Sequence, residues 1–525
     1  MSNRYDEVPY TSHPYARTHP DRLATLARLF GLEPPSPTTA RVLELGCASG
    51  GNLLPMAELL PQARFVGVDL SPRQIERARE LAAAAQLGNL ELHAASILDV
   101  DERWGQFDYV ICHGVYSWVP REVQDKILAI CRERLTSDGV AFISYNTYPG
   151  WRMREMVRDM MRWHVRGIAS PAAAIDQARA LVDFLARSVA GHDHQPHALQ
   201  LRKELALLEH ASDDYLFHEH LEECNQPLYF HEFVDRLAQH GLRYLCESDL
   251  HTMLSRELSD DVRRTLDRIA PDLVHMEQYL DFVRNRQFRA SLVCHGERTP
   301  HRALSPARMH GLRFGLPPTA AGEAIDLWPG VVHSFVDAEE RRISSGRSIT
   351  KAALACLQRS WPRELDFATL HARAATLLRE SGIAISEGAE SELAADLLEC
   401  VISGSGLDVR CEPCGAPTAL PQRPWAPAVA RAQARSSGAA TSLRHQRVAL
   451  DGFGIELLAA CDGTRDHAGL LAKAMQLLAR GAISVVLPEG VDVSPQRQAA
   501  ALADAIERTL AQLHRSSLLA DGGPP

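Results

Sequence analysis

Residues 41–71 constrain the fold of this chain more than any other stretch. They read RVLELGCASGGNLLPMAELLPQARFVGVDLS. Val42–Leu45 and Phe65–Val68 are short apolar runs typical of buried strands, and a glycine-rich turn at 46–51 joins the first run to a segment at helical spacing. The second run ends on Asp69. Strand, glycine turn, helix, strand and acid together predict a βαβ unit that binds a nucleotide-type cofactor.

The chemistry of the turn narrows the kind of cofactor. Glycine lets the backbone turn tightly and approach a ligand. A dinucleotide turn reads G-x-G-x-x-G and points a helix N-terminus at a pyrophosphate. Here Glu44 precedes Gly46 by two residues, and a carboxylate there would repel a pyrophosphate but suit the cationic end of an amino acid. The turn resembles the first motif of class I S-adenosylmethionine-dependent methyltransferases, [DE]-x-G-x-G/A-x-G, with Ala48 where a second glycine is commonest. The alternative is another Rossmann-like site.

This resemblance implies S-adenosylmethionine as the cofactor and assigns its contacts motif by motif. Glu44 and the glycine turn would hold the amino-acid end, Asp69 would accept the ribose hydroxyls, and Leu70 would pack on the adenine. Many members carry an acid where Ser96 stands, so either a backbone carbonyl or Asp99 would meet the adenine amine. The cofactor-binding residues expected in this way are Glu44, Gly46, Cys47, Ala48, Gly50, Asp69, Leu70, Ser96, Ile97 and His113.

Three further strands are predicted at 90–94, 107–112 and 140–145, each separated from the next by a turn or a helical stretch. Alternation of strands and helices indicates a mainly parallel, doubly wound sheet. The expected fold class is therefore α/β, with a Rossmann-like class I methyltransferase domain at the N-terminus. Ligands of such a sheet bind at the carboxyl ends of its strands.

Two aromatic loops follow the fourth and fifth predicted strands, HGVYSWVP at 113–120 and YNTYPGW at 145–151. An amine acceptor has to lose a proton and aim its lone pair at the methyl group, and aromatic faces favour cations. Proximity and alignment supply much of the rate in such a displacement. Core packing is the alternative for each aromatic residue. The acceptor-side candidates are His113, Tyr116, Trp118, Tyr145, Asn146 and Tyr148, and no single base is assigned among them.

Composition limits the partners. The chain has 525 residues, a formal net charge of −10 and eleven scattered cysteines. An acidic chain is not attracted overall to nucleic acid or to an anionic membrane, so we expect no nucleic-acid partner. It has no 18-residue uncharged apolar run and no signal-peptide region, which predicts no membrane insertion and a cytoplasmic protein with reduced thiols.

We expect no metal site. The segment 218–240 holds four histidines together with acids and Cys224, but no pair has the H-E-x-x-H form. Cys411 and Cys414 form a lone C-x-x-C without a second pair at zinc spacing.

A wider set of motifs resembles one bacterial family. These motifs are YDEVPY at 5–10, THP at 18–20, LELGCASGG at 43–51, HGVYSWVP at 113–120, SYNTYPGW at 144–151 and DFVRNRQFR at 281–289. Members of that family join a class I methyltransferase domain to a methyltransferase regulatory domain, and they include protein-lysine methyltransferases that modify outer-membrane proteins. The resemblance implies a protein substrate and leaves the acceptor open.

The organisation expected from these patterns has four parts. They are a methyltransferase domain with an N-terminal strap at 1–165, a helical regulatory domain at 166–305, a winged-helix-like middle domain at 306–420 and a winged-helix-like C-terminal domain at 421–525. The last part lacks a concentrated basic helix, so we expect it to bind protein or to form a homodimer. In the strap, Tyr5, Tyr10 and Tyr15 recur either as packing over the first domain or as a lid.

Two local predictions in the second half of the chain concern charged or proline-rich segments. Residues 279–294 are expected to form a helix with a basic face that includes Arg284, Arg286 and Arg289, which is either solvated or a docking surface for an acidic partner. The Pro/Ala/Arg-rich segment 417–440 is expected to be a linker.

The sequence thus predicts methyl transfer from S-adenosylmethionine, with a lysine ε-amine of a protein as the leading acceptor. Two alternatives stay open, namely a small-molecule methyltransferase and a non-enzymatic regulator that retains cofactor binding.

Overall fold

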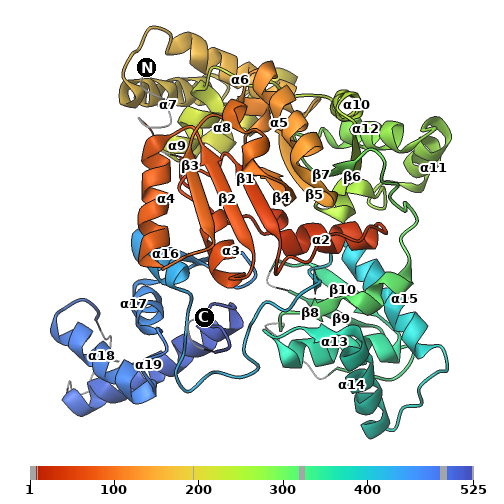
Figure 1. The fold of residues 1–525 in the computed structure, drawn as a ribbon, viewed down its shortest axis with the longest axis vertical. Coiled ribbons are helices and arrows are strands. Elements are labelled where there is room, and N and C mark those ends of the chain that lie inside the picture. The colour runs from red at the N-terminus through yellow and green to blue at the C-terminus, as the bar shows by residue number, and fades with distance from the viewer. Residues whose placement is uncertain are drawn as a thin grey trace.

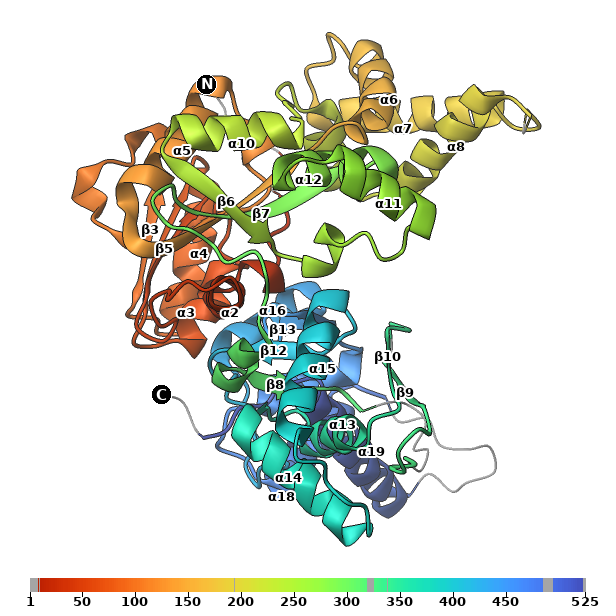
Figure 2. The same ribbon diagram turned by 90° about the vertical axis from the view of Figure 1, so that its right-hand side faces the viewer.

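A computed structural model describes residues 8, 10–192, 194–318, 325–337, 339–484 and 494–522. Tyr5 and most of the motif at 5–10 lie outside these residues. The chain forms a sheet-containing half, coloured red to green, and a largely helical half, coloured green to blue (Figures 1 and 2).

The first half is built on a seven-stranded sheet in the order β3-β2-β1-β4-β5-β7-β6. The first five strands of this order are parallel, whereas β7 is antiparallel to both of its neighbours. The strands are β1 (Arg41–Leu45), β2 (Arg64–Asp69), β3 (Leu90–Ala94), β4 (Phe107–Cys112), β5 (Leu135–Asn146), β6 (Leu242–Glu247) and β7 (Phe288–His295). The expected Rossmann-like α/β fold is confirmed.

The predicted βαβ unit is present, with α3 (Leu53–Leu59) between β1 and β2, and the observed strands extend the predicted ones by one residue at one or both ends. The apolar side chains of β1 and β2 are buried because helices cover both faces of the sheet. Ser71 caps α4 (Pro72–Ala84) by accepting a hydrogen bond from the backbone N–H of Gln74 at 3.1 Å. These local signals place the glycine turn at the carboxyl end of β1.

One prediction within the sheet is wrong. Residues 279–294 do not form one helix, because α12 (Leu273–Arg284) ends at Asn285 in the left-handed conformation and the chain continues as β7. Arg289 is fully buried and not on a solvated face. Its guanidinium lies among Glu247, Glu277 and Asp281. Strand β7 therefore joins β6 to the edge of β5 and completes the sheet (Figure 2).

Helices cover the two faces of the sheet. Side chains of α2 (Pro20–Leu29), α3 and α4 belong to the core on one face. Those of α5 (Arg121–Arg134) and α10 (Phe230–Gln239) belong to the core on the other. The core under α2 is continuous with apolar residues of the middle part of the chain.

A helical unit stands between β5 and α10, at the upper edge of the sheet (Figure 1). It consists of α6 (Trp151–His164), α7 (Pro171–Ser188), α8 (Pro196–Glu209), α9 (Asp213–Tyr215) and a π-helix (Leu216–Leu221), and it has a core of its own. The remaining helix near the sheet is α11 (Asp260–Ile269).

The second half contains short helices and small sheets. Its middle part has strands β8 (Arg313–Gly315), β9 (His333–Val336), β10 (Arg342–Ser345), β11 (Leu365–Asp366) and β12 (Asp408–Arg410), with helices α13 (Ser348–Ser360), α14 (Phe367–Glu380) and α15 (Ala389–Ser403). The C-terminal part has α16 (Ala428–Ser437), β13 (Ala439–Thr441), β14 (Arg447–Ala449), α17 (Gly452–Ala460), α18 (His467–Ala479) and α19 (Pro495–Arg515).

The prediction of a linker at 417–440 is wrong over its second half, which forms α16 and β13. The backbone N–H groups of Ala428 and Val429 at the start of α16 donate to the carboxylate of Glu58 on α3, at 2.5 and 2.9 Å. A negative charge is stabilised at a helix N-terminus, so this contact anchors the C-terminal part on the sheet domain. Among the helices in the described part of the chain, none combines the length and apolar character needed to span a bilayer.

Candidate functional site

The candidate site lies where the carboxyl ends of the parallel strands meet. Glycine turn 46–51 follows β1, Asp69 ends β2, His113 follows β4 and Asn146 ends β5. Parallel strands bring their exit loops to one edge of the sheet, which is where α/β proteins bind ligands. The sheet therefore brings the predicted cofactor-side residues to one place.

Backbone conformation explains the glycines of the turn. Gly46 and Gly50 have φ of +78° and +75°, and a Cβ on them would come within 2.4 Å of Val115 and 2.0 Å of Leu54. Ala48 has φ of +46°, a region in which a side chain is strained. The position where glycine is commonest in the methyltransferase motif thus has a glycine-like backbone here as well.

Glu44 is a buried carboxylate with one unused oxygen. Its Oε1 accepts a hydrogen bond from Asn52 Nδ2 at 2.7 Å, and its Oε2 has no hydrogen-bond partner among the residues that the structure describes. Burial raises the pKa of Glu44 to about 7. The hydrogen bond from Asn52 opposes this shift, and the negative charge of Asp69 adds to it. A buried unpaired carboxylate is costly unless it meets a cation. This arrangement fits the ammonium group of S-adenosylmethionine.

The ribose and adenine candidates lie beside the turn. Asp69 accepts hydrogen bonds from the backbone N–H of Ala48 at 2.8 Å and of Ser71 at 2.9 Å, which fixes its carboxylate at the tip of β2. Leu70 is 60% exposed, so its apolar side chain is available to a planar ring. Ser96 opens a short 3₁₀ turn, Ile97–Asp99, and its N–H donates to Asp99.

The N-terminal strap passes directly over the glycine turn. Gly51 N donates to Ser12 Oγ at 2.8 Å, and Tyr15 N donates to Asn52 Oδ1 at 2.9 Å. The ring of Tyr15 lies 4.0 Å from that of His113, centroid to centroid. The strap therefore covers the cofactor side of the site.

His113 is held as a neutral ring. Its Nδ1 lies 2.8 Å from Ser144 Oγ, and burial, with a smaller effect of Arg17, lowers its pKa to about 3. A neutral imidazole at this point adds no positive charge beside the place expected for the cationic sulfonium.

The acceptor-side candidates separate into two groups. Tyr116 and Tyr145 are almost fully buried, and both pack against Phe233 of α10 within the sheet core. Their catalytic role stays a prediction, and their burial favours a supporting position.

In the second group, Trp118 and Tyr148 are partly exposed, whereas Asn146 is buried. Trp118 packs edge-on against Trp151 at 5.8 Å. Asn146 donates to Asn225 Oδ1 at 3.0 Å, and Tyr148 OH donates to Glu155 at 2.6 Å. The roles of Trp118, Asn146 and Tyr148 also stay predictions.

Glu219 is a further candidate site residue, which sequence analysis considered only as part of a metal cluster. It belongs to the π-helix, and burial raises its pKa to about 7 against the opposing charges of Arg154 and Arg158. Burial raises the pKa of Tyr10 and of Tyr15, and the charge of Glu219 adds to both shifts, as that of Glu44 does for Tyr15. The acid-rich, aromatic segment around it carried no recognisable motif.

No metal centre is found in the described residues, since they contain no group of three or more His, Cys, Asp or Glu side chains placed to hold an ion. Cys411 and Cys414 are both buried, and burial raises the pKa of their thiols. Cys411 Sγ instead accepts a hydrogen bond from Thr25 Oγ1 at 3.3 Å.

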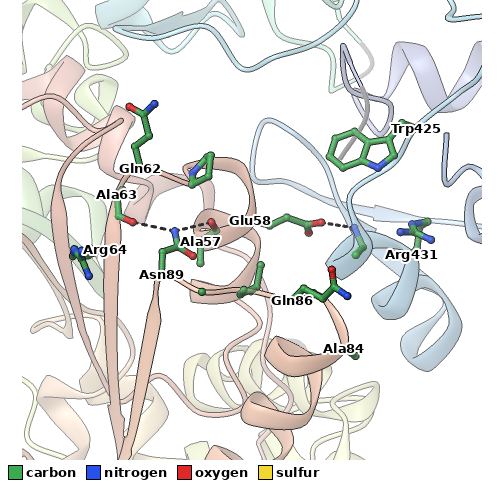
Figure 3. A pocket seen from close by; sticks show the side chains of 15 residues that line it. Ala57, Glu58, Gln62, Ala63, Arg64, Ala84, Gln86, Asn89, Trp425 and Arg431 are labelled. Atoms are coloured by element: carbon green, nitrogen blue, oxygen red, sulfur yellow. Dashed lines mark hydrogen bonds between the residues drawn. The ribbon is translucent and has the colours of Figure 1, made fainter. Parts of the chain in front are cut away.

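A cavity of about 700 Å³ lies elsewhere, at the amino ends of β2 and β3 (Figure 3). Glu58, Arg64 and Asn89 line it from the sheet domain, and Trp425 and Arg431 line it from the C-terminal part. It is a groove between two parts of the chain at the end of the sheet opposite to the candidate site.

Comparison with known families agrees with this geometry. Residues 42–139 match the family described as "Methyltransferase domain", and residues 212–295 match "Predicted methyltransferase regulatory domain". Residues 422–518 match "PKMT, C-terminal winged helix domain".

Individual relatives cover nearly the whole chain. Protein RP789 of Rickettsia prowazekii is 35% identical over 488 residues, which are 92% of this chain and 87% of the relative. The structure of PKMT2 from Rickettsia typhi is 30% identical, with a TM-score of 0.87 over 97% of this chain and all of that one. A second structure of PKMT2, in complex with AdoHcy, has a TM-score of 0.85 at 30% identity, with the same shares covered.

AdoHcy is the product that S-adenosylmethionine leaves after it donates its methyl group, and Glu44 and the glycine turn of this chain fit that cofactor. The chain therefore belongs to the family of class I S-adenosylmethionine-dependent methyltransferases that carry a regulatory domain and a PKMT winged-helix domain.

Proposed function

We propose that this methyltransferase acts on the ε-amine of lysine in a protein substrate. The observation that carries the proposal is the similarity to PKMT2 over the whole chain, accessory parts included. Those parts exceed what a small acceptor needs and supply surface for a large one. We further propose that 1–165, 166–305, 306–420 and 421–525 remain useful functional divisions, although β6 and β7 of the second belong to the sheet.

The proposed chemistry begins with deprotonation of the lysine. When bound, S-adenosylmethionine supplies an electrophilic methyl group on a sulfonium. An ammonium cannot attack that methyl group, so its proton has to leave first. Glu219 has a pKa near 7 and is our candidate for the group that accepts this proton. The faces of Tyr10 and Tyr15 would hold the cationic lysine beside it.

The remaining residues are proposed to position the two reactants. Glu44, Gly46, Cys47, Ala48 and Gly50 would hold the amino-acid end of the cofactor, with Asp69 at the ribose. Leu70, Ser96 and Ile97 would surround the adenine, and His113 would lie near the sulfonium. Trp118, Asn146 and Tyr148 would line the acceptor side, with Tyr116 and Tyr145 supporting them from the core.

The first experiment is transfer of labelled methyl from S-adenosylmethionine into a cell lysate that is then divided into protein and small-molecule fractions. We expect label in a few protein bands that hydrolysis yields as methyl-lysine. Label in the small-molecule fraction alone would contradict the proposal and favour a metabolite acceptor. Cofactor binding without any methyl transfer would favour a non-enzymatic regulator that retains cofactor binding.

A second experiment tests Glu219 directly. Glu219→Gln should lower transfer to lysine about 100-fold, the usual scale of a lost general base, while AdoHcy binding is retained. Glu209→Gln changes an exposed acid of the same helical unit and should leave transfer unchanged. Equal rates in all three proteins would remove Glu219 from the mechanism.

The family resemblance makes purified outer-membrane proteins the first substrates to test. The eleven free cysteines favour a reducing compartment such as the cytoplasm. We also propose a homodimer through the C-terminal part, because that part lacks a concentrated basic helix for nucleic acid, and light scattering of the purified chain measures it.

A further inference from the structure

A turn of the C-terminal part reaches the cofactor side of the sheet domain. Residues 442–446 connect β13 to β14, and His445 at their tip is 1% exposed with φ of +58°. Its Nε2 lies 2.8 Å from Asn52 Oδ1, although the two residues are 393 positions apart. Asn52 is the residue whose amide nitrogen donates to Glu44.

The chemistry of the donors and acceptors around Asn52 fixes the direction of its hydrogen bonds to Tyr15, His445 and Glu44. The backbone N–H of Tyr15 can only donate, so the Asn52 atom that faces it at 2.9 Å is the oxygen. His445 lies against that same oxygen and must donate through Nε2–H. The amide nitrogen is then left to face Glu44 Oε1 at 2.7 Å.

The ring of His445 is neutral, in agreement with this assignment. Burial, with a smaller effect of Arg410, lowers its pKa to about 3. The ring of His19 lies 5.3 Å away, and burial holds the pKa of His19 well below its usual range as well. A neutral ring with a protonated Nε2 can donate one hydrogen bond, and Asn52 receives it.

The position of the turn depends on both accessory parts. Arg444 pairs with Asp408 of β12 and donates to the carbonyl of Pro362 at 2.6 Å. Leu443 N donates to the carbonyl of Ser517, just after α19, at 2.8 Å. His445 can therefore reach Asn52 only when the middle and C-terminal parts are docked together on the sheet domain.

We propose that His445 is a positioning residue for cofactor binding, which acts through Asn52 on the carboxylate of Glu44. By holding the Asn52 oxygen, it keeps the amide nitrogen on Oε1 and leaves Oε2 directed at the cofactor ammonium. Cofactor affinity is thereby coupled to docking of the C-terminal part. This coupling concerns the cofactor alone and holds whatever the acceptor is.

Calorimetric titration of the full chain with AdoHcy tests the proposal. His445→Leu removes the donor and keeps the bulk, and the dissociation constant should rise about tenfold, the scale of one lost hydrogen bond. His445→Gln can place an N–H near the Nε2 position and should recover most of the affinity. Gln446→Ala alters an exposed residue of the same turn and should bind as the unmodified chain does.

A double-mutant cycle with Asn52→Ala separates positioning from general destabilisation. With Asn52 already removed, His445→Leu should cost little further affinity, because the path to Glu44 is broken. Thermal unfolding of each variant confirms that it is folded, and His445→Ala, which also removes the donor, replaces the leucine variant in the cycle if that variant does not fold. Unchanged affinity in His445→Leu, or an equal loss in both backgrounds, would overturn the proposal.

Discussion

Two buried glutamates in one sheet illustrate how differently this protein treats a buried charge. Glu44 on β1 is 4% exposed and Glu247 on β6 is 1% exposed. Burial raises the pKa of both, yet Glu44 ends at about 7 and Glu247 at about 2. The difference lies in their partners, because Arg289 and Arg286 with two further hydrogen bonds outweigh burial at Glu247.

The comparison distinguishes a buried charge that stabilises the fold, at Glu247, from a buried charge that remains available to a ligand, at Glu44. Both oxygens of Glu247 are hydrogen-bonded, with Arg289, Ser291 and Ala290 N among the donors, and its charge is neutralised within the fold. Glu44 has one donor and one unused oxygen. A fully satisfied buried network fixes a structure, whereas a partly satisfied one is costly until its partner arrives.

The largest effect is expected from Arg289→Met. This change leaves Glu247, Glu277 and Asp281 without their common cation, and removal of one partner from a buried ion network costs about 3–5 kcal/mol. Denaturant unfolding followed by fluorescence should show the midpoint of the sheet domain shifted strongly downward.

Arg298→Met is the control for that measurement. Arg298 pairs with Asp138 at 2.7 Å, and both side chains are 39% exposed, so the loss should stay below about 1 kcal/mol. Equal destabilisation by the two variants would break the distinction between a structural network and a surface pair.

Glu44→Gln should affect binding instead of stability. If Glu44 pairs with the cofactor ammonium as proposed, removal of its charge should weaken AdoHcy binding about 100-fold, while the unliganded protein unfolds no earlier than the unmodified one. Glu80→Gln, an exposed acid on α4, is the control. Retained affinity in Glu44→Gln would show that the unused oxygen does not meet the cofactor.

The two carboxylates should respond oppositely to acid. Glu44 has a folded pKa of about 7 against 4.5 in the unfolded chain, so its ionisation costs stability increasingly as pH rises from 4.5 to 7. Glu247 has a folded pKa of about 2, so its stabilisation is complete above pH 4.5 and is lost as pH falls toward 2.

The pH dependence of cofactor affinity should reveal the ionisation of Glu44. Below pH 7 the ammonium can pair with Glu44 only after the carboxyl loses its proton, so AdoHcy binding should weaken about tenfold per pH unit. Calorimetry between pH 5 and 8 should show this slope in the unmodified chain and a flatter line in Glu44→Gln. Parallel slopes would place the titrating group elsewhere.

The smallest effect is expected from Ala48→Gly. Relief of the strain at positive φ should raise the free energy of unfolding by about 1–2 kcal/mol. The extra flexibility of glycine in the unfolded chain should lower it by about 0.5–1 kcal/mol. The net result should be a slightly higher melting temperature. Ala83→Gly, in the exposed last turn of α4, should instead lower the melting temperature, because glycine is a poor helix former. A lower melting temperature in Ala48→Gly would contradict the strain at the turn.

Local patterns were sufficient to predict the first half of the sheet. Each signal used there depends only on residues that are close in the sequence. These signals are the spacing of apolar residues, the helix start at Ser71-Pro72 and the acid at Asp69. The cofactor-side residues follow from the same patterns, because parallel strands bring their ends together.

Contacts between distant segments account for what was missed. Strand β7 was read as a helix because Arg289 looked like a surface charge, and only its pairing with acids from β6 and α12 allows it to be buried. Asn52 reads as an ordinary helix-start residue, yet its side chain makes no cap there. Nothing near His445 in the sequence points to a residue 393 positions away.

The antiparallel strand β7 also affects the order in which the protein can form during synthesis. Asn146 at the end of β5 pairs with Phe288, so at 5–20 residues per second the ribosome needs roughly 7–28 seconds to deliver the strand that covers this edge. Until then β5 presents unpaired N–H and C=O groups to other chains. The long helical unit between them is translated first, and a nascent chain that stalls within it would leave an incomplete sheet open to aggregation.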